Sequence, residues 1–266
     1  MAPSRPRVLT GLQLPELVHS LLGSDSPSSV LVVCASKDIF VEQLYATCLD
    51  SSNSNANDEH PAETIVEPEA NEPSKTEAHP LLKQPTLYQL ATSRKVKLVF
   101  CPELVHLRAY LSTLAIPSSQ PASTHTTDNS VKQHKTRVSS LVLLNPIDLH
   151  RNTSSFSAQG LNRTFALAVE AAHATHTQLL MIECPSFGAH YGNDHEFESE
   201  FEAETTVPPR PPPGADLWDE EVSILNVTTK SFGAGGRGWV GRTVTVRRVA
   251  ERWFVFSPFR REEGFG

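Results

Sequence analysis

Short apolar runs recur along the chain and alternate with segments whose apolar residues are spaced as on one face of a helix. The clearest example lies between Ser139 and Ser186, which opens with the run 141–144 and closes with the run 179–182. Runs without polar alternation are typical of parallel strands covered on both faces. Apolar residues at helical spacing join the two runs: Leu161, Phe165, Ala168, Val169 and Ala172. This segment therefore predicts a strand-helix-strand unit in a central parallel sheet.

The preceding chain repeats this alternation. Strands are predicted at 7–11, 29–34 and 95–100, and helices at 14–22, from Ser36 onward, at 87–91 and from Pro102 to Leu114. Ser36 is the expected N-cap of its helix, and Pro102 is expected at the first helical position, where its missing N–H costs nothing.

The C-terminal part of the chain has a different pattern. Residues 222–228, 242–249 and 251–256 have strand composition, and in the second of these segments polar and apolar residues alternate. Alternation indicates strands with one solvated face, typical of antiparallel pairing. The predicted fold class is α/β: a three-layer sandwich with a mainly parallel central sheet and antiparallel C-terminal edge strands.

Three polar segments interrupt the pattern, at about 51–79, 117–136 and 187–216. They have no hydrophobic period and are rich in acidic residues or proline, so we interpret them as disordered insertions in a single domain spanning 1–266. The third contains the proline-rich string VPPRPPP. We interpret it as a solvated linker in preference to a polyproline ligand for another protein.

Composition narrows the function classes. The chain has 266 residues and a formal net charge of −7, which argues against indiscriminate nucleic-acid binding by the chain as a whole. No apolar run approaches a membrane span, and an intracellular protein without membrane contact is expected. The four cysteines lack metal spacing, so buried free thiols are expected.

The order of elements resembles the RecA-like recombinase and ATPase family, especially its eukaryotic recombinase paralogues. The likeness lies in residues 28–44, in the segment 140–150 with the helix and strand that follow it, and in 237–256. These stretches match the family in the order of their elements and in their pattern of apolar and polar residues. The resemblance therefore implies a RecA-like sandwich but does not by itself imply catalysis.

Two departures from that family concern its chemistry. No GxxxxGK[ST] string exists to wrap phosphates, and the segment where it is expected offers only Thr10-Gly11-Leu12. Asn145 stands where the metal-binding acid is usual, with Asp148 three residues later. Both positions therefore look degenerate, and we expect no enzyme activity, no cofactor and no metal.

A RecA-like fold without these motifs is similar to the subunits of Shu-type complexes. That resemblance implies a nuclear protein that supports homologous recombination and DNA repair, pairs with another RecA-like or Shu-type subunit, and binds single-stranded or forked DNA. A less close resemblance is to the motif-poor RecA-like subunits of the Elongator complex. It implies instead a cytoplasmic structural subunit of a ring in tRNA modification.

Candidate nucleic-acid contacts cluster near the C-terminus, which is basic although the chain is acidic. They are Lys230, Arg237, Trp239, Arg242, Arg247, Arg248 and Arg252. Arginines contact phosphates and tryptophan stacks on bases. The alternative is an ordinary solvated sheet edge whose charges prevent aggregation.

Three other patterns have ordinary structural interpretations, which we favour. The glycine-rich segment 233–241 indicates a hairpin loop more than a phosphate loop. His173 and His176 are typical of a helix end more than of a zinc site completed by Glu183. Asp148 and His150 favour a turn over a metal site.

Overall fold

The computed structural model describes residues 5–23, 28–54, 81, 84–116, 139–151, 153–184, 217–225 and 242–259. Its strands are β1 (Arg7–Thr10), β2 (Ser29–Val33), β3 (Val96–Phe100), β4 (Ser140–Leu144), β5 (Gln178–Ile182), β6 (Glu221–Ser223), β7 (Thr243–Thr245) and β8 (Val255–Pro258). Its α-helices are α1 (Leu14–Gly23), α2 (Lys37–Ser54), α3 (Leu87–Ser93), α4 (Leu104–Ala115), α5 (Pro146–Arg151), α6 (Ala158–Thr175) and α7 (Val246–Ala250), and η3 (Leu217–Asp219) is a short 3-10 helix.

Six strands form the central sheet, in the order β3-β2-β4-β5-β1-β8. All of the neighbouring pairs are parallel. The predicted strand-helix-strand unit is confirmed, because β4 and β5 lie side by side with Leu141 opposite Leu179.

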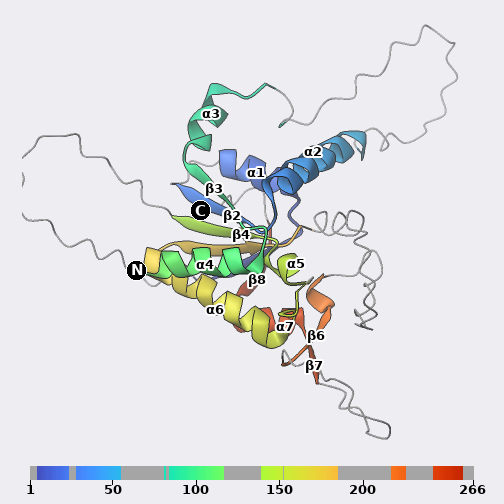
Figure 1. Ribbon diagram of the computed structural model, residues 1–266. Helices are drawn as coiled ribbons and strands as arrows, with labels where there is room; N and C mark the ends of the chain where they lie inside the picture. The colour runs from blue at the N-terminus through green and yellow to red at the C-terminus, as the bar shows by residue number, and fades with distance from the viewer. Residues whose placement is uncertain are drawn as a thin grey trace, which may run out of the picture.

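The sheet is the middle of three layers. Figure 1 shows α1 and α2 on one side of it and α4 and α6 on the other. Alternate residues of each central strand feed the two cores: Leu143 packs with the residues of α4 and α6, whereas Leu144 packs with those of α1. Because both faces are covered, every residue of β2 and β4 is buried, and this explains their continuous apolar runs.

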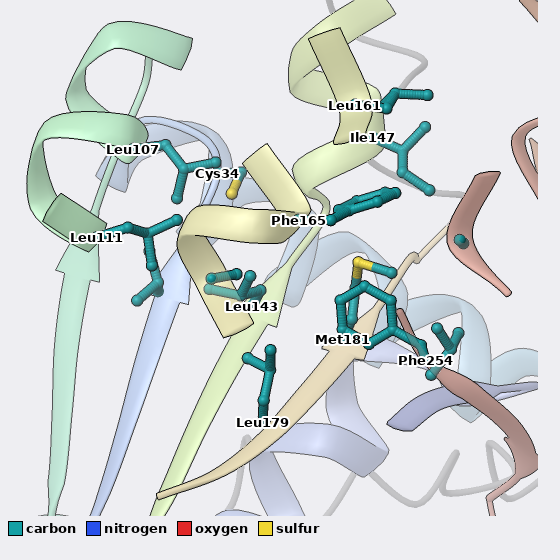
Figure 2. Packing of buried hydrophobic residues seen from close by; sticks show 14 of the residues in the cluster. Cys34, Leu107, Leu111, Leu143, Ile147, Leu161, Phe165, Leu179, Met181 and Phe254 are labelled. Carbon is teal, nitrogen blue, oxygen red and sulfur yellow. The ribbon is translucent and has the colours of Figure 1, made fainter. Parts of the chain in front are cut away.

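Phe165 of α6 is the centre of the larger core. It is completely buried and meets Phe254 edge to face, with ring centroids 5.3 Å apart. Figure 2 shows it between Leu143 and Met181 of the sheet and the C-terminal segment. Truncating such a ring to alanine typically lowers the free energy of unfolding by about 3–5 kcal/mol. Through this contact, α6 holds the C-terminal segment against the sheet.

Local signals in the sequence explain the limits of α6. The side chain of Ser157 caps its N-terminus by accepting the N–H of Gly160, and His176 ends it in the left-handed conformation. A Cβ on Gly160 would lie 2.0 Å from the carbonyl oxygen of Ser155. Only glycine therefore allows the preceding loop to pack against the first turn of the helix.

The predicted antiparallel C-terminal edge of the main sheet is wrong. β8 extends the sheet in parallel, with Val255 opposite Arg7, and the antiparallel pair β6-β7 forms a separate small sheet. The strand predicted at 242–249 ends early, because the hydroxyl of Thr245 accepts the N–H of Arg248 and starts α7. The alternation of polar and apolar residues in 242–249 therefore comes from a three-residue strand followed directly by the N-cap of a helix.

Smaller differences concern element ends. The N-cap of α4 is Glu103, so Pro102 precedes the helix and does not occupy its first position. The helix α2 continues to Ser54, into the start of the predicted insertion at 51–79. The rest of that insertion, the whole insertion at 117–136 and nearly all of that at 187–216 lie outside the described residues.

Candidate functional site

The loop after β1 occupies the position where a nucleotide-binding α/β fold wraps phosphates. Gly11 has a φ of 75°, and Leu12 is buried. The N–H of Gln13, just before α1, donates to the Glu16 carboxylate at 3.2 Å. A negative charge thus already lies at the helix N-terminus, where it would repel a phosphate.

Asn145, at the expected metal-binding position, has a structural role. Its backbone is left-handed, with a φ of 58°, and its side chain is 1% exposed. The amide oxygen accepts the N–H of Cys184 at 2.8 Å, and the amide nitrogen donates to the Cys184 carbonyl at 3.1 Å. Asn145 therefore joins the loops after β4 and β5, and both of its polar atoms are used.

Asp148 lies on α5, where the sequence suggested a turn. Its carboxylate is 3.9 Å from the Arg151 guanidinium one helical turn away. Arg151 also forms a two-nitrogen contact with the carboxylate of Glu220, which ties α5 to the segment before β6. Asp148 is thus part of a charged network that links α5 to the segment before β6.

Glu183 is a half-buried acid at this edge whose carboxyl points out of water, and the sequence patterns do not single it out as a site in its own right. Its Oε1 accepts the N–H of Ile147 at 2.6 Å, whereas its Oε2 is buried with no hydrogen-bond partner among the described residues. Burial raises the pKa of this carboxyl well above its usual range, although the bond from Ile147 opposes the shift. Removal of the carboxyl from water thus favours its protonated form.

The cysteines at the carboxyl ends of the strands are buried free thiols, as predicted. Burial raises the pKa of Cys184 to about 12 and that of Cys34 well above its usual range. Thiolates are the nucleophilic and metal-binding form, so these side chains are inert. Within the described part of the chain, no group of three or more His, Cys, Asp or Glu could hold a metal ion.

His150 is also held in an unreactive form. It is completely buried, its Nδ1 donates to the Ser155 carbonyl, and its Nε2 lies 2.9 Å from the Thr164 hydroxyl. Burial lowers the pKa of His150 to about 4, so the ring is neutral at physiological pH. Arg108 completes this network by donating to the same Thr164 hydroxyl at 3.1 Å.

The second region of interest is an open cleft of about 930 Å³ between the start of α6, the ends of β6 and β7, and α7. Its walls include Ile224, Leu225 and Val244, and two of the predicted nucleic-acid residues, Arg248 and Arg252, line it. The backbone of a third, Arg242, accepts the N–H of Ile224 at 3.1 Å. Two of the predicted arginines thus line one cleft, and a third is bonded through its backbone to a residue of the cleft wall.

Arg247 does not share that environment. Its guanidinium lies 5.0 Å from the centre of the Phe256 ring and 3.5 Å from the Asp219 carboxylate. The alternating pattern predicted a solvated strand face for Arg247, whereas on α7 its guanidinium packs against a ring and a carboxylate of the C-terminal region. The described contacts of Arg247 hold α7 against η3 and β8.

Three predicted residues, Lys230, Arg237 and Trp239, lie outside the described residues, as does the glycine-rich segment 233–241. Two cleft residues, Gln159 and Asn162, are not singled out by the sequence patterns. They are three residues apart in the first turns of α6 and so share one face of the helix. Both are polar, so the apolar helical spacing of α6 does not point to them.

A third region is an apolar surface beside β3, at the end of the main sheet away from β8. β3 is an edge strand in which Leu98 is 48% exposed. On α2, Val41, Tyr45 and Leu49 form an exposed stripe at helical spacing. An exposed strand edge and an exposed apolar helix stripe are typical of surfaces that bind another protein.

Comparisons with known proteins leave the family open: no protein-family model, no curated protein and no solved structure matches the chain. Among the described residues, no helix has the length and apolarity needed to cross a bilayer.

Proposed function

We propose that the chain is a non-catalytic RecA-like subunit that supports homologous recombination and DNA repair by binding single-stranded DNA and a second RecA-like or Shu-type subunit. The observation that carries the nucleic-acid part is the open cleft lined by Arg248 and Arg252, which we call the arginine cleft. Arg248 lies on α7 and Arg252 in the turn that follows it, both at an open surface, and phosphate contacts by such side chains dominate nucleic-acid affinity.

The non-catalytic part of the proposal is supported by the edge of the sheet where nucleotides bind in such folds. The Glu16 carboxylate already accepts an N–H at the start of α1, and both polar atoms of Asn145 are bonded to Cys184. The partner part is supported by the exposed apolar surface along β3 and α2, which suits a hetero-oligomer.

Charge reversal tests the DNA-binding part. In an Arg248→Glu, Arg252→Glu double variant, we expect affinity for a single-stranded oligonucleotide to fall about a hundredfold. The slope of log affinity against log salt should become shallower by about 2, because two phosphate contacts are lost. The matched control is Arg94→Glu, Lys95→Glu, which changes two exposed charges next to β3. Equal losses in both variants, or an unchanged salt slope, would overturn the assignment.

Identification of partners tests the biological part. Affinity purification of the tagged protein from nuclear and cytosolic fractions, followed by mass spectrometry, should recover recombination proteins. The mass of the co-expressed complex should be that of a heterodimer. Recovery of Elongator subunits in a closed hexamer would instead favour the alternative, a cytoplasmic structural subunit in tRNA modification.

A further inference from the structure

We propose that the arginine cleft holds an unstacked nucleobase of a single-stranded nucleic acid, and that this makes the protein select single strands over duplexes. This inference rests on the proposed function and concerns what the cleft adds to phosphate binding. The volume of about 930 Å³ lies within the range of pockets that enclose small ligands.

The cleft combines apolar walls with polar groups, as base-binding pockets do. Ile224 and Leu225 are 41% and 58% exposed, at the end of β6, and offer apolar surface to the face of a base. Phosphates on either side of that base would meet Arg248 and Arg252. The Arg248 side chain is 78% exposed, and the contact of its guanidinium with the Glu251 carboxylate is long, at 3.9 Å.

Asn162 supplies a polar group of fixed orientation. The indole N–H of Trp253 donates to its amide oxygen at 2.8 Å. Because an indole nitrogen can only donate, the amide oxygen must face Trp253, which leaves the NH₂ group as the donor to a ligand. Amides of this kind bind the hydrogen-bonding edges of bases.

The start of α6 does not itself provide an anion site. The N–H of Gln159 donates to the Ile224 carbonyl, and the N–H of Gly160 donates to the Ser157 hydroxyl. The positive charge of the cleft therefore comes from its arginines, and its apolar walls add selectivity for unpaired bases. A paired base would first have to leave its stack, which costs a few kcal/mol and disfavours duplexes.

The test separates base binding from phosphate binding. In an Ile224→Ser, Leu225→Ser variant, both exposed apolar walls are lost while the arginines remain. Single-strand affinity should fall about tenfold or more, with the duplex affinity and the salt slope unchanged. An Asn162→Asp variant keeps an acceptor for Trp253, removes the NH₂ donor and adds a negative charge, so it should lose more affinity for single strands than for duplexes. Circular dichroism and thermal melting would establish that both variants are folded.

Changes in the ligand give an independent readout. Replacing the bases of the oligonucleotide by abasic sites should weaken binding to the wild type but not to the Ile224→Ser, Leu225→Ser variant. Parallel measurements with DNA and RNA of the same sequence would identify the preferred strand. Equal affinity for single strands, duplexes and abasic strands would overturn this inference but leave phosphate binding intact. Absence of binding to any nucleic acid would overturn the proposed function as well.

Discussion

The carboxyl edge of the central sheet and the arginine cleft both contain polar and charged residues. They differ in how far those residues are shielded from solvent. At the sheet edge, Asn145 and the cysteines are buried, the Asn145 amide and the Glu183 carboxyl bond to the backbone, and the pKa of the Glu183 carboxyl is raised. In the cleft, Arg248 and Glu251 are exposed, with only one long ion pair between them. Polar groups at the edge thus maintain the fold, whereas those of the cleft are available to a ligand.

The largest predicted effect comes from placing an acid at position 145. An Asn145→Asp substitution tolerates the left-handed backbone, since Asp also adopts it. However, it replaces a donor to the Cys184 carbonyl by a carboxylate oxygen in a buried site. We expect a loss of about 3 kcal/mol in the free energy of unfolding, measured by urea denaturation. ATP hydrolysis by this variant would contradict the structural role of the position.

A smaller effect is expected from Glu183→Gln. The folded-state pKa of Glu183 is raised, so above about pH 4.5 the unfolded chain loses a proton that the folded chain retains. Wild-type stability should therefore decline as the pH rises towards the folded-state pKa, and the amide variant should lack this decline.

At pH 8 the Glu183→Gln variant should gain stability relative to the wild type, with the difference shrinking towards pH 4.5. Urea denaturation at a series of pH values measures this. Parallel stability curves for the two proteins would show that the Glu183 carboxyl is ionised in the folded state.

Arg247 and Arg248 offer a comparison between adjacent residues. Arg247→Ala removes the contacts with Phe256 and Asp219 and should cost about 1 kcal/mol of stability, with little change in single-strand affinity. Arg248→Ala should leave stability within about 0.5 kcal/mol and reduce the salt slope by about 1. If both variants lose DNA affinity equally, Arg247 also contacts phosphate.

The smallest expected effect concerns nucleotide. Because a carboxylate already caps the start of α1, addition of Mg²⁺ and ATP should shift the melting temperature by less than about 1 °C. A ligand present at a hundred times its dissociation constant would stabilise the protein by about 2.7 kcal/mol. A clear upward shift in a thermal melt would therefore show a retained nucleotide site.

The sequence predicts the central sheet because its information there is local. Buried on both faces, β2 and β4 read as continuous apolar runs, and α6 shows a helical period with a serine cap. The C-terminal region misleads because a Thr-Val-Thr strand followed directly by a capped helix continues the alternation of a strand. The parallel pairing of β8 with β1 depends on tertiary packing. The alternation of polar and apolar residues does not indicate which strand β8 will pair with.

The candidate site is predictable only in part. A cluster of arginines near the C-terminus is visible in composition, but the contacts of Arg247 with Phe256 and Asp219 depend on how α7 packs in the folded chain. The role of Asn162 depends on a bond to Trp253, far away in sequence. The buried state of Glu183 likewise requires α5 to fold over the end of β5.

The position of β1 has a consequence for how the chain is made. β1 lies between β5 and β8, so Arg7 pairs with Leu180 on one side and Val255 on the other. At roughly 5–20 residues per second, a ribosome needs about 10–50 s after making β1 to make its second neighbour. During that interval an apolar strand has unpaired backbone groups. Its sheet partners arrive late, so a chaperone that shields β1 during synthesis would raise the yield of folded protein.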